Sequence, residues 1–187
     1  IVLLHSGIVY SSERDPTQLF AALRRLKQSA HPLARRLLLR LRATGNDASM
    51  REMIAAAGIA DLVELAPAIP YADALAEMLT VDGLLVLQAA NCNDQIPAKA
   101  YEYLRAQRPL LALTDPAGDT ADVIRRAGID TIAPLDDSDA IFAALVDFLQ
   151  AVERGDAPLA RQQAVQDASR RGRTAQFARL LDSACGL

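Results

Sequence analysis

Short apolar runs alternate along this chain with longer segments in which apolar and polar residues recur at helical spacing. Each apolar run is followed by a loop of polar residues, glycine or proline, a pattern that is typical of buried β-strands. We therefore expect six strands, at residues 1–5, 37–41, 62–65, 82–87, 109–113 and 128–133.

The segments between these runs predict helices. We expect helices to begin at Pro16 and Pro97, because proline suits the first helical position. Asp15 is placed to cap the first of them, and Gly58 is placed to end a helix over 48–57. Further helices are expected over 71–79, 119–127 and 141–153, and a last amphipathic helix from 158 towards Leu181.

Strands and helices that alternate with short connections predict an α/β fold. We expect a Rossmann-like parallel sheet of about six strands with helices on both faces, over residues 1–155, with 156–187 as an appendage. Ligands bind such sheets beyond the carboxyl ends of the strands, near the point where the strand order reverses. The loops expected at that edge are 6–15, 44–47, 66–69, 88–96, 114–118 and 134–138.

The segment from Asp94 to Leu104 carries the strongest functional pattern. Ile96 has no oxygen to cap the helix that follows, so the free N–H groups of its first turn and the helix dipole favour an anion. Lys99 and Glu102 share one helical face, where a cation could bind phosphate and a carboxylate could bind sugar hydroxyls. The alternatives are a surface ion pair between these two residues, and capping by Asp94 or Gln95 of a helix that begins earlier.

The loop after the first strand offers two more candidates. Gly7 would let a ligand approach the backbone closely, and the planar fork of Arg14 could bind phosphate. The alternatives are that Gly7 only satisfies a turn and that Arg14 pairs with Glu13 or Asp15. No dinucleotide-binding G-x-G-x-x-G and no P-loop is present.

Other polar residues are weaker functional candidates. His5 ends the first strand at the ligand edge, but a lone histidine is more often structural than catalytic. Asp136, Asp137 and Asp139 are expected to cap the helix that follows them. The arginines near the carboxyl end are expected to form a solvated face or a surface that meets another domain; they are 161, 170, 171, 173 and 179.

Composition narrows the choice of function. The chain is 51% hydrophobic, enough for a sizeable core, and its net charge of -3 argues against a general nucleic-acid surface. Two isolated cysteines indicate neither a disulfide framework nor a metal-ligand pattern, so we expect a reducing, cytoplasmic location. We also expect no metal and no cofactor. No apolar stretch of about 18 residues is present, which predicts no transmembrane segment. The chain begins at Ile1 inside an expected strand, so we expect a fragment of a longer polypeptide.

Four motifs together are similar to a known family. They are His5-Ser-Gly7, Arg14-Asp-Pro16, Ile96-Pro-Ala-Lys-Ala-Tyr-Glu-Tyr-Leu104 and Arg108-Pro-Leu-Leu-Ala112. This order resembles the carboxy-terminal, donor-binding half of GT-B glycosyltransferases, particularly the retaining group that includes family 4.

The resemblance implies roles for individual residues. Gly7 and Arg14 would contact the donor diphosphate, allowing one residue of loop-length difference. Lys99 and Glu102 match a Pro-x-Lys-x-x-Glu-Tyr segment whose glutamate binds the ribose hydroxyls. Asp94, eight positions before that glutamate, would act as the catalytic acidic residue beside the transferred sugar, although glutamate is more usual there.

The chain also departs from the family pattern. A Gly-Phe-Gly run before Asp94 is missing, and Ala66 stands where a glycine often precedes the base-contacting loop. These departures bear on the sugar contact more than on the nucleotide contact.

The resemblance implies a domain that binds a nucleotide sugar and takes part in sugar transfer to an unknown acceptor. Its partner would be a missing amino-terminal acceptor domain of the same chain, without which the fragment would be inactive. Residues 156–187 would pack on the donor domain or cross to that missing half, through which any peripheral membrane association would also occur. The alternatives are the donor half of a GT-B sugar-nucleotide epimerase and a non-catalytic α/β docking module.

Overall fold

The structure is a computed structural model that describes residues 1–186. Its strands form one sheet in the order β3-β2-β1-β4-β5-β6, and all neighbouring strands are parallel. The strands are β1 (Val2–Ser6), β2 (Leu38–Arg42), β3 (Val63–Ala66), β4 (Gly83–Leu87), β5 (Leu110–Leu113) and β6 (Ile132–Ala133). The predicted α/β class and the parallel sheet are confirmed.

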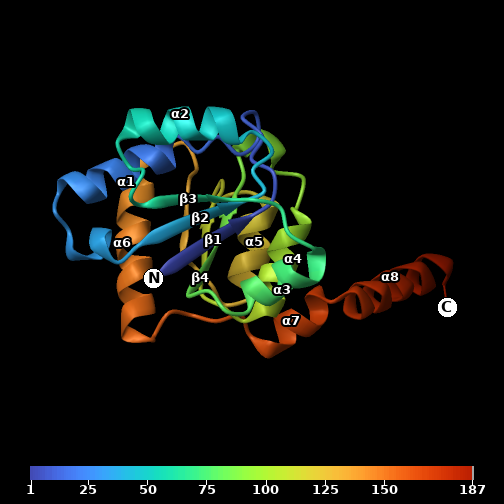
Figure 1. Ribbon diagram of the computed structural model, residues 1–187. Helices are drawn as coiled ribbons and strands as arrows, with labels where there is room; N and C mark the ends of the chain where they lie inside the picture. Colours follow the sequence, from blue (N-terminus) through green and yellow to red (C-terminus); the bar gives the residue numbers. More distant parts are fainter. Residues whose placement is uncertain (187) are drawn as a thin grey trace.

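Helices cover both faces of the sheet (Figure 1). They are α1 (Thr17–Gln28), α2 (Asp47–Ala57), α3 (Tyr71–Met78), α4 (Ala98–Ala106), α5 (Asp119–Arg126), α6 (Ser138–Arg154), α7 (Gln162–Ala168) and α8 (Arg170–Cys185). Two short 3-10 helices, η1 (Pro32–Arg35) and η2 (Ala90–Cys92), lie in connections.

Two apolar layers hold the helices on the sheet. Alternate residues of one strand point to opposite faces. Leu85 therefore belongs to the apolar layer that includes α1, α2 and α6, and Leu84 to the layer that includes α3, α4, α5 and α7. Because both faces are covered, β4 and β5 carry no polar side chain, and all their residues are buried.

The strand order reverses between β1 and β4. The chain first adds β2 and β3 on one side of β1, and then crosses to add β4, β5 and β6 on the other. In sheets of this order the ligand crevice lies outside the carboxyl ends of the two strands at the reversal. The loops after β1 and β4 therefore flank the expected site.

The last predicted strand is shorter than expected. Residues 128–131 were expected to belong to it, but the Gly128 and Ile129 N–H groups donate to Arg125 O and Ile124 O and close the end of α5. Gly128 has a φ of +89°, a conformation suited to glycine at a helix end. Only Ile132 and Ala133 pair with β5.

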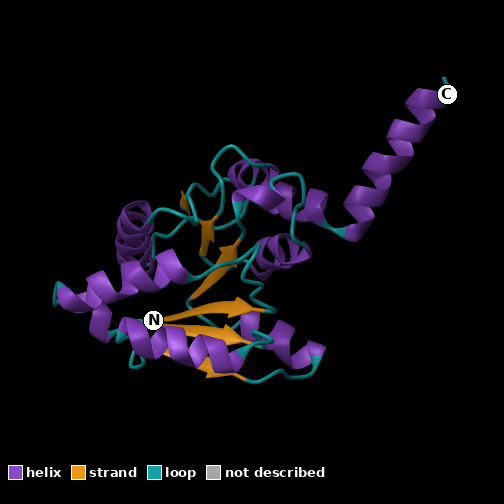
Figure 2. Cartoon of the chain, turned by 90° about the horizontal axis from the view of Figure 1, so that it is seen from above, coloured by secondary structure: helices purple, strands orange, loops and turns teal. Residues whose placement is uncertain are grey.

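The prediction of a single last helix is wrong. Ser169 has an extended backbone, ψ 155°, and its side chain caps α8 by accepting a hydrogen bond from Gly172 N at 3.0 Å. Helix α7 packs against α4, whereas no residue of α8 is buried within the described part of the chain. Figures 1 and 2 show α8 extending away from the body. Leu187 lies outside the described residues.

Candidate functional site

Helix α4 begins without a side-chain cap. The helix begins at Ala98, one residue later than predicted, so Pro97 is its N-cap residue instead of its first residue. Neither Asp94 nor Gln95 caps the helix. The buried Gln88 side chain shapes the preceding loop by donating to the carbonyls of Cys92, at 2.6 Å, and Gln95, at 2.5 Å. The expected lack of a side-chain cap at this helix start is confirmed, although the Ala100 N–H already donates to Pro97 O at 2.9 Å.

Lys99 reaches from the first turn of α4 to the end of β1. Its Nζ lies 3.1 Å from His5 Nε2. A Cβ atom at Gly7 would lie 2.9 Å from the same Nζ, and Gly7 has a φ of +128° that favours glycine. Burial and the nearby Arg14 guanidinium lower the pKa of Lys99 to about 8. The ammonium thus lies at the end of β1, directly against the backbone of Gly7.

His5 is fully buried and neutral. Its Nδ1 lies 2.9 Å from Leu85 O, which can only accept, so Nδ1 carries the hydrogen and Nε2 keeps its lone pair. Burial first, and then the Lys99 charge, hold the pKa of His5 well below its usual range. Sequence reasoning weighed His5 by itself and did not foresee its contact with Lys99.

Arg14 folds back along its own loop. Its Nη1 donates to Ile8 O at 3.2 Å, and its Nη2 lies 3.8 Å from Glu13 Oε2. The guanidinium also lies over the Tyr10 ring, 5.3 Å from the centroid. The alternative of pairing with Glu13 is what the structure shows, while the Arg14 charge still acts on Lys99.

Glu102 faces the start of α3, which follows the loop after β3. Its Oε1 accepts a hydrogen bond from the Tyr71 hydroxyl at 3.0 Å, so its partner is not Lys99. A hollow of about 220 Å³ lies between α3 and α4 at this point. It is lined by Tyr71, Leu75, Met78, Leu79, Glu102, Arg105 and Ala106.

Buried Tyr103 fixes α4 against the sheet. Its hydroxyl accepts a hydrogen bond from Ser6 N at 2.9 Å, at the end of β1. This contact fixes α4, which carries both Lys99 and Glu102, against the end of β1. Tyr103 matched the sequence motif, but its role as an anchor was not predicted.

Asp94 is exposed on the loop before α4. The cavity nearest that loop is only about 70 Å³ and is lined by Glu13, Arg14, Gln88, Cys92, Gln95, Ile96 and Pro97. Of the predicted site residues only Arg14 lines this cavity; Asp94, Lys99, Gly7 and Glu102 do not.

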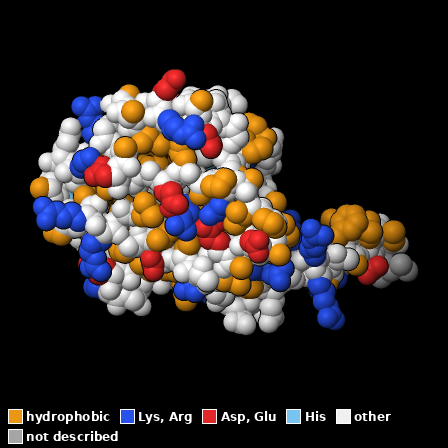
Figure 3. Space-filling model, viewed as in Figure 1, with side chains coloured by type: hydrophobic (Ala, Val, Ile, Leu, Met, Phe, Trp, Pro, Cys, Tyr) orange, Lys and Arg blue, Asp and Glu red, His pale blue; other side chains and the backbone are white. Residues whose placement is uncertain are grey.

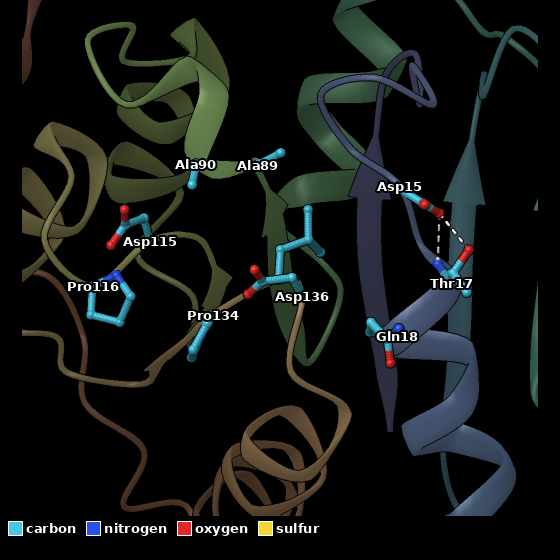
Figure 4. A pocket seen from close by; sticks show the side chains of 10 residues that line it. Asp15, Thr17, Gln18, Ala89, Ala90, Asp115, Pro116, Pro134 and Asp136 are labelled. Carbon is cyan, nitrogen blue, oxygen red and sulfur yellow. Dashed lines mark hydrogen bonds between the residues drawn. The ribbon is translucent and has the colours of Figure 1, made fainter.

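A larger cavity, about 400 Å³, lies on the other side of the β4 end (Figure 4). Asp15, Asp115 and Asp136 come to it from three different loops. Sequence reasoning included these loops but did not single out Asp115, which accepts from Asn93 Nδ2 at 2.6 Å and Ala117 N at 2.8 Å. These hydrogen bonds lower the pKa of Asp115.

Within residues 1–186 no group of side chains suited to a metal ion is found.

Two predicted caps can be compared with the structure. Asp137 caps α6 as expected, accepting from Asp139 N at 2.9 Å and Ala140 N at 3.0 Å. Asp15 lies one residue before the N-cap position of α1, and its carboxylate accepts from Thr17 N at 2.9 Å.

No helix among the described residues is long and apolar enough to cross a membrane. No protein-family model matches this chain. A search of curated proteins likewise finds no match.

Solved structures are similar to this one. The pneumococcal O-GlcNAc transferase GtfA in complex with UDP and GlcNAc matches with a TM-score of 0.60 and 16% identity, over 89% of this chain and 32% of GtfA. Anabaena Alr3699/HepE in complex with UDP and glucose matches with a TM-score of 0.62 and 17% identity, over 97% of this chain and 48% of HepE. The catalytic domain of cholesterol-α-glucosyltransferase from Helicobacter pylori matches with a TM-score of 0.62 and 15% identity, over 90% of this chain and 96% of that domain.

The chain therefore spans about a third of the length of GtfA and about half of the length of HepE. Identities this low establish a shared fold. This chain has a Rossmann-like α/β fold that matches part of these GT-B glycosyltransferase structures.

Proposed function

We propose that this chain is the nucleotide-sugar donor-binding domain of a glycosyltransferase, equivalent to the carboxy-terminal half of a GT-B enzyme of the family 4 type. The observation that carries the proposal is the Lys99 ammonium, which lies against Gly7 beside the uncapped start of α4, where the strand order reverses. A positive charge and free N–H groups directed at one crevice suit a diphosphate.

The chemistry of sugar transfer explains why these groups are needed. When the glycosidic bond forms, the nucleoside diphosphate leaves with additional negative charge. The Lys99 ammonium and the first N–H groups of α4 would stabilise that charge without a metal ion. Arg14 would add a second cation by turning from Glu13 towards the diphosphate.

Glu102 would bind the ribose. A carboxylate can accept hydrogen bonds from both ribose hydroxyls, and Tyr71 holds this one at the edge of the hollow between α3 and α4. Asp94, exposed on the loop before α4, is proposed as the catalytic acidic residue beside the transferred sugar.

A second domain would complete the proposed enzyme. We propose that a second α/β domain of the same polypeptide binds the acceptor, and that residues 156–187 contact it. Helix α8 exposes 60% of Phe177 and 65% of Leu180, an apolar surface suited to such packing. Figure 3 shows arginines where α8 leaves the body and apolar side chains further along it. We propose a cytoplasmic location for the whole protein.

The test is nucleotide binding by Glu102→Ala, with Glu52→Ala as the matched control. Glu52 is an exposed glutamate on α2, far from the crevice in the sheet order. We expect the affinity for UDP, GDP or ADP, whichever the wild type binds, to fall about ten-fold or more in Glu102→Ala, because charged hydrogen bonds are lost. The control should bind as the wild type does.

Isothermal titration calorimetry measures these affinities directly. Equal affinities in Glu102→Ala and the wild type would refute the ribose-binding role. A wild type that binds none of the three nucleotides would instead indicate a docking module.

A further inference from the structure

We propose that His5 is a positioning residue for the diphosphate site: its neutral imidazole accepts a hydrogen bond from the Lys99 ammonium and holds that ammonium against Gly7. This inference rests on the proposed function, because it concerns the group that would meet the diphosphate. It gives a role to a buried histidine that donor chemistry does not otherwise require.

The geometry fixes the direction of both hydrogen bonds of His5. Leu85 O on β4 accepts from Nδ1 at 2.9 Å, so the ring is locked in one tautomer. Nε2, on the opposite side of the ring, can then only accept, and Lys99 Nζ lies 3.1 Å from it. The imidazole therefore connects the backbone of β4 to the side chain of α4 across the end of β1.

A neutral acceptor suits this position better than a carboxylate would. A carboxylate at 3 Å would form an ion pair with Lys99 and compete with the incoming phosphate oxygens. The neutral imidazole orients the ammonium and leaves its charge for the ligand. The other charged groups that act on Lys99 are Arg14, from the loop after β1, and Glu102, on α4.

Protonation of Lys99 should then control diphosphate binding. Burial and Arg14 lower the pKa of Lys99 to about 8, while Glu102 raises it. A hydrogen bond to Nε2 favours the charged amine, so loss of this bond should lower the pKa further. Affinity for a nucleoside diphosphate should fall as pH rises through 8 in the wild type, and at lower pH when the acceptor is removed.

Two substitutions separate the two hydrogen bonds of His5. In His5→Asn the amide can still donate to Leu85 O but is too short to reach Lys99. In His5→Gln the carbonyl oxygen can replace Nε2 as acceptor while the Leu85 contact is lost. If His5 had a purely structural role, the two variants would differ in stability while the titration midpoint of Lys99 stayed unchanged. Thermal unfolding of both variants is therefore measured as well.

The chain has only two lysines, Lys27 and Lys99, which makes the readout direct. In protein labelled with ¹³C at lysine Cε, two signals are titrated against pH. Lys27 serves as the internal control. It lies on α1, on the face of the sheet opposite to α4, and contacts Asp61. The same samples are titrated with UDP, GDP and ADP at pH 7 and pH 9.

We expect the Lys99 midpoint to fall by about one pH unit in His5→Asn and to stay near the wild-type value in His5→Gln. Nucleotide affinity at pH 7 should fall about ten-fold in His5→Asn and be largely restored in His5→Gln.

If the wild type binds nucleotide but His5→Asn changes neither the Lys99 midpoint nor the affinity, the inference is wrong and the proposed function stands. If the wild type binds no nucleotide, the proposed function fails and the positioning role fails with it, whatever the titration of Lys99 shows.

Discussion

Lys99 occupies a position that favours function over stability. A largely buried ammonium with only a neutral hydrogen-bond partner is less stable than the same group in water. Its pKa near 8, instead of the usual 10.5, expresses this penalty. Residues that are unfavourable for folding and point into a crevice are candidates for ligand binding.

Lys99→Met should therefore stabilise the fold. At pH 7 both the folded and the unfolded wild type carry a protonated Lys99, and the full burial penalty applies. Between pH 8 and 10.5 the folded protein loses this proton first, so the unfolding free energy should rise with pH in the wild type. We expect Lys99→Met to be more stable at pH 7, by about 1–3 kcal/mol, and to lack this rise.

Urea unfolding at several pH values measures both effects. A Lys99→Met variant that is less stable than the wild type at pH 7 would show that the ammonium contributes to folding, contrary to this account.

At the scale of elements, a charged network joins β2 to α3. Glu77 of α3 accepts from Arg42 Nη2 at 2.7 Å and from Arg40 Nη1 at 3.0 Å. The side chains of Arg42 and Glu77 are each only 11% exposed. Hydrogen bonds from Arg42 first, and then from Arg40, lower the pKa of Glu77. Because α3 forms one wall of the hollow beside Glu102, this network also supports the candidate site.

Glu77→Gln should destabilise the protein by about 1–3 kcal/mol at pH 7, because it leaves the largely covered Arg42 without its counter-ion. The pKa of Glu77 is lower in the folded state than its usual value of 4.5. Ionised Glu77 therefore contributes fully to the unfolding free energy above pH 4.5, and this contribution is lost as the pH falls through the pKa of the folded state. Acidification below about pH 4.5 should therefore destabilise the wild type more than the variant.

Glu64→Gln is the matched control. Glu64 pairs with Arg40, but its side chain is 42% exposed, so we expect a loss below about 1 kcal/mol. Chemical unfolding curves at pH 7 and pH 4 distinguish the two variants. If both variants lost the same unfolding free energy, the lower exposure of the Arg42–Glu77 pair would not increase its contribution to stability.

At the scale of the whole molecule, the sequence predicted what depends on local pattern. Apolar runs and helical spacing predicted the alternating elements and the parallel sheet, and the absence of a polar side chain at the N-cap predicted the open start of α4. The break at Ser169 was missed because residues 158–181 keep a helical composition throughout. The shortening of β6 followed from hydrogen bonds that close α5 at Gly128.

The candidate site could be predicted only in part. Gly7, Lys99 and Glu102 were identified from loop position and spacing. The His5–Lys99 contact joins residues that are 94 positions apart, and the Tyr103–Ser6 contact joins residues 97 apart, so no local pattern reveals either. The cavity around Asp115 likewise depends on the order of β4, β5 and β6 in the sheet.

The most direct test of the central claim is to locate nucleotide binding on the ¹⁵N-labelled chain. UDP, GDP and ADP are titrated separately, and the backbone amide signals that move are mapped onto the fold. We predict that one of the three moves the amides of Gly7, of residues 98–100 and of Glu102. Movement confined to the cavity lined by Asp115 and Asp136, or no movement with any of the three, would contradict a diphosphate site at the start of α4.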